Sequence, residues 1–166
     1  MPIATALTTQ EDRTWSLLIG VMTWLPAELD AFAEREAGLS HAEYWVLRWL
    51  VTDADADVHM TRLATGASVT PSHLSRIVGR LERRGLLARQ PDPHDARRTQ
   101  VQLTDAGRSL VEDLEPRYAA EIRGRVFDLL GDRQDAQLED LSERILEAMR
   151  PDCIALVPPR TTPRLP

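Results

Sequence analysis

The stretch that decides the fold class is "RLERRGLLARQPDPHDARRTQVQLTDAG", residues 80–107. Two short segments that suit β-strands, LLARQ and TQVQLT, lie on either side of the loop PDPHDARR. In the second segment Val101 and Leu103 alternate with Gln100 and Gln102, the pattern of a strand with one buried face. The stretch therefore predicts a β-hairpin with a charged loop at its tip.

Two helices are predicted immediately before this hairpin. A short one runs from Thr61 to Gly66, and a longer one starts at Thr70-Pro71, an N-cap residue followed by proline at the first helical position. Gly85 is suited to end the longer helix. Two helices joined by a tight turn and followed by a hairpin predict a winged helix-turn-helix. Four apolar residues of the longer helix are expected to face the core: Leu74, Ile77, Val78 and Leu81.

Further helices are predicted on the N-terminal side. Residues 14–38 carry apolar side chains at the spacing of a helix that packs on another helix, and Pro26 is expected to kink it near Trp24. Ser40 and Glu43 form a capping-box pattern at the start of a second helix, which is apolar nearly all round and so is expected to be buried. The packing positions of the first helix are Trp15, Leu18, Met22, Leu25, Leu29 and Phe32.

Two more helices are predicted after the hairpin. Thr104-Asp105 caps a long helix bent at Pro116, and Asp132 caps the next one. Residues 151–166 are rich in proline and are expected to form a loose tail. The apolar stripe of the first of these helices is Leu110, Val111, Leu114, Tyr118, Ile122, Val126 and Leu129; that of the second, expected to face inward, is Leu138, Leu141, Ile145 and Met149.

The charge of the chain is unevenly distributed. The formal net charge is −6, yet residues 62–98 contain eight arginines against three acidic residues. A basic segment within an acidic protein is typical of a protein that meets phosphate on one face. The sequence contains no HExxH, P-loop or GxSxG motif, so nothing in it predicts an enzyme.

Composition also bears on location. The only cysteine is Cys153, so no internal disulfide is possible, and the first ten residues lack the pattern of a secretory signal. The most apolar window, WSLLIGVMTWLP, is twelve residues long, shorter than a helix that spans a bilayer. These features predict a cytoplasmic protein.

The order of elements and the hairpin residues resemble the multiple antibiotic resistance regulator (MarR) family. Asp92-Pro93-x-Asp95-x-Arg97 followed by Val101-x-Leu103-Thr104-x-x-Gly107 is similar to that family's wing signature, and residues 74–89 resemble its recognition helix and first wing strand. The resemblance implies a mostly α-helical homodimer in which residues 14–38 and 104–150 form an intertwined dimerisation region and residues 39–103 the DNA-binding domain. It further implies a transcriptional regulator, expected to be a repressor. Such a regulator binds a pseudo-palindromic operator and is released by a small aromatic or anionic ligand.

The DNA-binding residues follow from this reading. Arg76 is expected to contact guanine in the major groove, and Arg97 to enter the minor groove, oriented by Asp95. The complete predicted set is Thr70, Pro71, Ser72, His73, Ser75, Arg76, Arg80, Asp95, Arg97 and Arg98.

Several alternatives stay open at this point. Asp92, His94 and Asp95 offer one reading as metal ligands. The loop has no cysteine and no second histidine at ligand spacing, however, so we expect no metal or other cofactor. Other readings of the chain are a winged-helix protein-interaction module without operator binding, and a regulator that responds to metal or redox state. Each candidate effector-binding residue can instead belong to the core or the dimer interface: Trp15, Trp24, His41 and Trp45.

Overall fold

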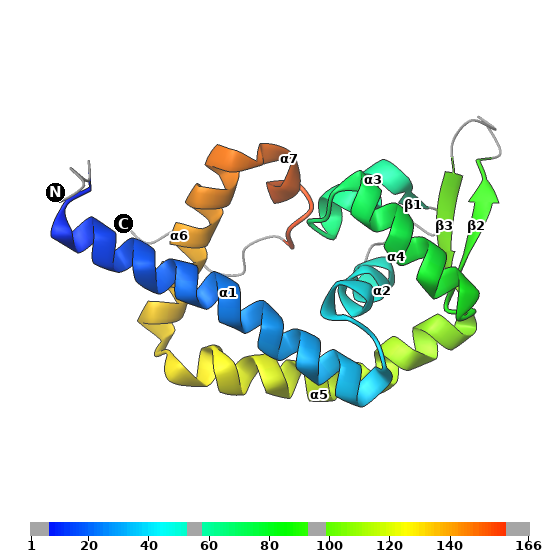
Figure 1. Cartoon of the computed structure of the whole chain (residues 1–166), viewed down its shortest axis with the longest axis horizontal. Helices are drawn as coiled ribbons and strands as arrows, with labels where there is room; N and C mark the ends of the chain where they lie inside the picture. The colour runs from blue at the N-terminus through cyan, green and yellow to red at the C-terminus, as the bar shows by residue number, and fades with distance from the viewer. Residues whose placement is uncertain (1–6, 53–57, 93–98, 159–166) are drawn as a thin grey trace, which may run out of the picture. The chain divides into compact units, whose positions relative to one another are not determined.

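The computed structural model describes residues 7–52, 58–92 and 99–158. The chain divides into two compact units, residues 1–41 and 42–166. Helices make up most of both, and a small antiparallel sheet lies in the second (Figure 1). The predicted fold class, mostly α-helical with a winged helix-turn-helix, is confirmed. That residues 14–38 and 104–150 form one intertwined region stays a prediction.

Helix α1 (Thr9–Ala37) makes up most of the first unit. It begins five residues before the predicted start, because Thr8 and Glu11 form a capping box: the Thr8 hydroxyl accepts from the Glu11 amide and the Glu11 carboxylate accepts from the Thr8 amide at 2.7 Å. The helix continues through Pro26 and ends at Gly38, whose φ of 60° is the left-handed conformation that glycine adopts without strain.

Helix α2 (His41–Thr52) starts directly after Ser40, as predicted, and is largely buried. Half-buried Trp45 and Arg48 interrupt the buried face. One of the buried residues, Glu43, is charged, so the helix brings a carboxylate into the core. The buried set is Glu43, Tyr44, Val46, Leu47, Trp49 and Leu50.

The helix-turn-helix consists of α3 (Met60–Gly66) and α4 (Pro71–Arg83). Thr70 caps α4 as predicted: its hydroxyl accepts a hydrogen bond from the His73 amide at 3.3 Å. Beyond the end of α4, Gly85 has a φ of 70° and so turns the chain toward the wing. All four side chains predicted to face the core are completely buried.

The wing is a three-stranded sheet rather than a simple hairpin. Strand β2 (Leu87–Pro91) pairs with β3 (Thr99–Leu103) as predicted, but β1 (Val58–His59) pairs with the other edge of β3. Two residues are too few to show an alternating pattern, so the sequence did not reveal β1. The added strand places His59 opposite Gln100, which is only 8% exposed. The expectation that Gln100 lies on an outer face was therefore wrong.

Helix α5 (Asp105–Arg125) begins at the predicted cap, where the Thr104 hydroxyl accepts from the Gly107 amide at 3.1 Å. It continues through Pro116 but ends at Arg125, and the 3₁₀ turn η1 (Phe127–Leu129) follows. The stripe predicted to extend to Leu129 therefore stops earlier, and Leu129 is 72% exposed. The part of the stripe that is buried consists of Val111, Leu114 and Tyr118.

Helix α6 (Asp132–Met149) has no buried residue within the chain. Its N-cap is Gly131, one residue before the expected cap, and the Gln134 side chain accepts from the Gly131 amide at 3.0 Å. The apolar stripe predicted to face inward is exposed instead. The stripe residues are 41–64% exposed: Leu138, Leu141, Ile145 and Met149.

The segment expected to be a loose tail begins with a helical turn, α7 (Pro151–Ile154). Cys153 is buried there and its sulfur lies 3.6 Å from the carbonyl oxygen of Thr65 in α3. Figure 1 shows α7 beside α3. The expectation of a loose segment was thus wrong for residues 151–154, because one apolar side chain attaches the turn to the helix-turn-helix.

Candidate nucleic-acid interface

The first half of α4 presents a polar, basic surface. Ser72, Ser75 and Arg76 are exposed, while His73 is half-buried. The Thr70 hydroxyl lies 3.4 Å from that of Ser72, so two predicted DNA contacts also organise the start of the helix. Because the opposite face of α4 is buried in the core, this polar face is fixed toward solvent.

Arg80, one turn further along α4, has a different environment. Its Nε atom donates a hydrogen bond to the carboxylate of Glu43 in α2, which is only 7% exposed. A carboxylate removed from water requires such a partner. Arg80 is thus held at the junction of α2 and α4, a contact that sequence reasoning missed because it joins residues 37 positions apart.

The base of the wing is tied to α4. The Arg89 Nη2 atom of β2 donates to the backbone carbonyl of Ser75 at 3.1 Å, and its Nε lies 3.7 Å from the Glu82 carboxylate. Arg89 therefore links the wing to the first half of the recognition helix. The sequence contains no local signal for this contact.

Asp92, at the end of β2, is 8% exposed, and one of its carboxylate oxygens lies 3.4 Å from the Nε2 atom of His59. This places it at the base of the wing. The rest of the wing loop lies outside the described residues, including His94, Asp95, Arg97 and Arg98. Elsewhere in the described chain no three metal-ligating side chains cluster.

A polar network joins α2 to α5. The Glu115 carboxylate accepts from the Tyr44 hydroxyl at 2.7 Å, and from Nε and Nη2 of Arg48 at 2.9 Å each. Tyr44 also packs on Tyr118, with ring centroids 4.6 Å apart. Two elements far apart in the sequence are thus connected through one carboxylate.

The network changes the titration of its members. Burial raises the pKa of Glu115, but hydrogen bonds from Arg48 and Tyr44 outweigh burial and hold this pKa below its usual range. Burial raises the pKa of the Tyr44 hydroxyl, with a further contribution from Glu115, and raises the pKa of Tyr118 to about 12. The carboxylate is therefore charged, and both phenols neutral, at physiological pH.

The candidate effector-binding residues lie in varied surroundings. Trp15 and Trp24 of α1 are 51% and 69% exposed, and Trp15 borders a mostly apolar hollow on that helix. His41 is half-buried; burial lowers its pKa, partly offset by Asp30. Trp45 stacks under the Arg48 guanidinium, 5.1 Å from its ring centroid. A common pocket for these four residues stays a prediction.

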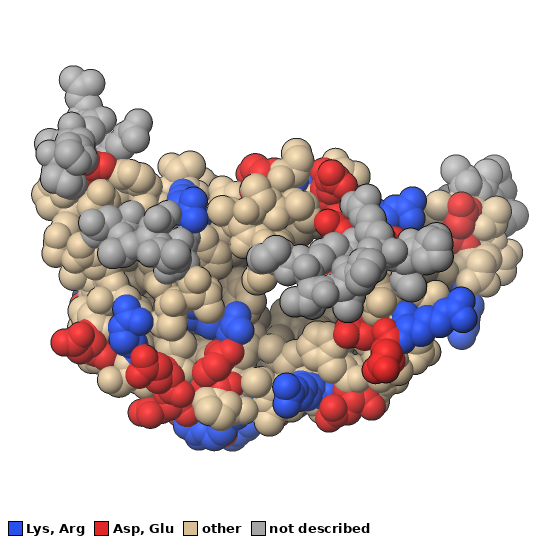
Figure 2. Space-filling view, turned by 180° about the vertical axis from the view of Figure 1, so that it is seen from behind, with Lys and Arg blue, Asp and Glu red and all other residues tan. Residues whose placement is uncertain are grey.

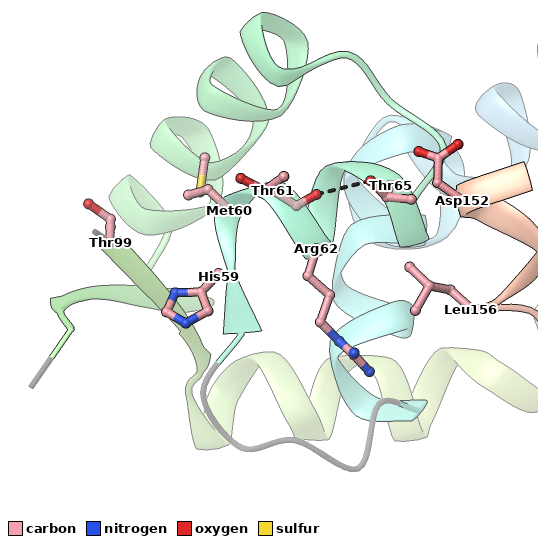
Figure 3. A pocket seen from close by; sticks show the side chains of 8 residues that line it. All are labelled: His59, Met60, Thr61, Arg62, Thr65, Thr99, Asp152 and Leu156. Carbon is pink, nitrogen blue, oxygen red and sulfur yellow. Dashed lines mark hydrogen bonds between the residues drawn. The ribbon is translucent and has the colours of Figure 1, made fainter. Parts of the chain in front are cut away.

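A separate open cavity of about 770 Å³ lies between α3, the wing strands and α7 (Figure 3). Figure 3 shows Arg62 extending from α3 and Asp152 standing near Thr65. Both charged groups have partners: Arg62 lies over the Trp49 ring, and Asp152 accepts from Arg150 at 2.9 Å. None of the candidate effector residues lines this cavity.

The charge pattern of the surface is mixed. On the face drawn in Figure 2, Arg side chains lie among Asp and Glu side chains, and the described residues form no wide area of one sign there.

By length and composition alone, helix α1 is long and apolar enough to cross a membrane. It contains an 18-residue window with a mean hydropathy of 1.3, of which 17% is buried. The apolar part of this helix is thus longer than the twelve-residue window WSLLIGVMTWLP, because the helix continues through Pro26.

Comparisons with known proteins agree on one family. A profile of the MarR family matches residues 37–98. The crystal structure of Sco3205, a MarR family transcriptional regulator from Streptomyces coelicolor in complex with DNA, is 31% identical, covers 90% of this chain and 94% of that one, and has a TM-score of 0.85.

Two further proteins are similar. CouR from Rhodococcus jostii RHA1, bound to p-coumaroyl-CoA, is 29% identical with a TM-score of 0.67, covering 78% of this chain and 88% of that one. The uncharacterised HTH-type transcriptional regulator YkoM of Bacillus subtilis (strain 168) is 28% identical over 101 residues, 61% of this chain and 64% of its own length. With the winged helix-turn-helix described above, these matches show that the chain belongs to the MarR family of transcriptional regulators.

Proposed function

We propose that the chain is a homodimeric repressor that binds a pseudo-palindromic operator in double-stranded DNA and is released by a small aromatic or anionic effector. The observation that carries the proposal is the division of α4 into a completely buried apolar face and an exposed face with Ser72, Ser75 and Arg76. A helix held in this way can enter the major groove without rearrangement.

Base recognition is assigned first to Arg76. It is exposed on α4, and an arginine that forms two hydrogen bonds with guanine contributes about 1–3 kcal/mol of discrimination against a wrong base. Arg97 of the wing is assigned to the minor groove, supported by the sequence pattern alone. The DNA complex of Sco3205 supports DNA as the partner of this chain.

Dimerisation is supported by apolar side chains that the single chain leaves exposed. In α1, Trp15, Val21 and Trp24 are each more than half exposed, and the stripe of α6 is exposed along its length. Exposed apolar surfaces of this kind mark interaction sites. We assign them to a second copy of the chain rather than to a membrane, and we propose that the protein is cytoplasmic.

The proposed effector is a small aromatic or anionic molecule. CouR is bound to p-coumaroyl-CoA, a ligand with both an aromatic and an anionic part, which supports the same class here. Trp15, Trp24, His41 and Trp45 remain the candidate contacts, since aromatic side chains with a polar edge suit an aromatic ligand.

The test is fluorescence anisotropy with the full chain on DNA from immediately upstream of its own gene and on a scrambled duplex, at ~150 mM salt. A preference of ~10³-fold or more for the upstream DNA is expected for a specific regulator. Arg76→Ala and Arg97→Ala should each reduce this preference. Arg144→Ala serves as the matched control, because it removes an exposed arginine of α6 that is paired with Asp140.

Equal, weak binding to both duplexes would contradict specific recognition of this DNA. Absence of binding even at low salt would favour the protein-interaction reading instead.

A further inference from the structure

Arg80 and Glu43 are placed to control how α4 is held. Glu43 is buried in α2, and its carboxylate accepts a hydrogen bond from Nε of Arg80. The Arg80 side chain is 42% exposed, so the guanidinium is accessible to solvent, but the bond to Glu43 fixes its position. Moving the guanidinium away would leave the buried Glu43 carboxylate unpaired, which costs free energy. The pair is therefore held in a narrow range of geometries.

The same helix, α2, is attached to α5 by its neighbouring side chains. Tyr44 and Arg48 are four residues apart, so they lie on one face of α2, and both donate to Glu115 of α5. Glu43 precedes Tyr44 and points instead to α4. Neighbouring residues of α2 thus contact the recognition helix through the Glu43 carboxylate and contact α5 through Tyr44 and Arg48.

We infer that Arg80 is a positioning residue, which acts through Glu43 to set the orientation of α4 on α2, and that the Glu115 contacts extend this constraint to α5. Arg80 therefore determines which half-site spacing the dimer reads rather than neutralising a phosphate. The inference rests on the proposed function, since it concerns how the operator is read.

The position of Arg80 along α4 supports this role. It lies four residues after Arg76, hence on the same face and one turn away from the side chain assigned to base recognition. The helix itself is anchored by Leu74, Ile77 and Leu81, all completely buried. Loss of the Glu43 contact should therefore leave α4 folded but less firmly oriented.

The experiment compares Arg80→Gln, Glu43→Gln and the double variant, as full chains, on the operator and on operators whose half-sites are moved apart or together by one base pair. Each single variant should lose ~10-fold in operator affinity, and the double variant should lose no more than either, because the two groups act as one unit. Each single variant should also discriminate less than the wild type between the native half-site spacing and the altered spacings.

Two readouts separate positioning from a direct phosphate contact. If Arg80 neutralised a phosphate, Arg80→Gln would lower the slope of log affinity against log salt by about 1.8, that is about 0.9 for each of the two copies in the dimer. Glu43→Gln, which removes a negative charge, would then tighten binding. Under the inference the slope is unchanged and Glu43→Gln weakens binding. Tighter binding by Glu43→Gln, or a reduced slope for Arg80→Gln, would overturn it.

Controls keep these outcomes separable. Arg83→Gln makes the same charge change on an exposed residue of α4 and should keep the native spacing preference. If Glu43→Gln does not fold, Arg80→Lys serves in its place: it retains the charge but loses the planar guanidinium, and it should show the same loss at an unchanged salt slope.

Failure of the proposed function would appear in the wild-type protein, as equal binding to operator and scrambled duplex. The inference then has its own readout in hydrogen exchange of the amides of residues 74–81. These should exchange faster in both Glu43→Gln and Arg80→Gln than in Arg83→Gln. Equal exchange in the three variants would overturn the inference independently of DNA.

Discussion

Replacing Gly107 with alanine would place a methyl group against the backbone at the start of α5. A Cβ atom at this position would lie far inside contact distance of the Leu86 carbonyl oxygen and 3.0 Å from Cδ1 of Leu103. The Leu86 oxygen cannot easily withdraw, because it accepts a hydrogen bond from the Thr104 amide at 3.2 Å. The cap of α5 and the end of the wing therefore meet where only glycine fits.

The size of the effect follows from two opposing contributions. Overpacking a well-packed site costs about 1–3 kcal/mol. Alanine in a helix gains roughly 0.5–1 kcal/mol over glycine. Subtracting this gain from the cost leaves an expected net loss of about 0–2.5 kcal/mol of the free energy of unfolding, and contact with a backbone oxygen rather than a flexible side chain favours the upper end.

The assay is urea unfolding followed by circular dichroism, at one fixed protein concentration because the dimer couples stability to concentration. The matched control is Gly79→Ala in α4, where the nearest atoms to the added Cβ are ends of the Arg83 and Arg89 side chains at 3.9 Å. This variant should be as stable as the wild type or up to about 1 kcal/mol more stable. If Gly107→Ala were stabilised as much as the control, the steric argument would be refuted.

Two further predictions concern α5 and α6. The folded-state pKa of Glu115 lies below its unfolded value of roughly 4.3, so its contacts stabilise the fold fully above that pH and lose this effect as pH falls through the folded pKa. In urea unfolding from pH 7 to 3, the free energy of unfolding should therefore decline less for Glu115→Gln than for the wild type. Equal declines in the two proteins would contradict the network. A double variant with Leu141→Glu and Ile145→Glu puts charges on the exposed apolar stripe of α6 and should shift the protein from dimer to monomer in analytical ultracentrifugation. The control Arg133→Gln, at an exposed residue of the same helix, should remain dimeric. An unchanged dimer in the double variant would place the interface elsewhere.

Elements with strong local signals were predicted well. The start of α4 follows from Thr70-Pro71, and its end from Gly85, because capping and a left-handed φ depend on neighbouring residues alone. The same holds for the cap of α5 at Thr104. The start of α1 was missed although Thr8 and Glu11 carry the capping-box signal in the sequence.

The wing shows where local patterns become insufficient. The alternation in residues 99–103 predicted a strand, but Gln100 is buried because β1, 41 residues earlier, pairs with that edge. Periodicity reports which side chains share a face, and not which face is covered. The same limit explains α6, whose apolar stripe was predicted correctly as a stripe but is exposed within the chain.

The sequence by itself determined the helix-turn-helix, the hairpin that follows it and the residues on the exposed face of α4. These features depend on spacing, caps and turns within a few residues. Only the tertiary structure decided that Arg80 is held by Glu43, that Arg89 ties the wing to α4, and that Glu115 joins α5 to α2. Each of these contacts pairs a charge with a group far away in the chain. Which pairs form depends on where the buried faces of the helices bring those charges together, and no local pattern encodes that.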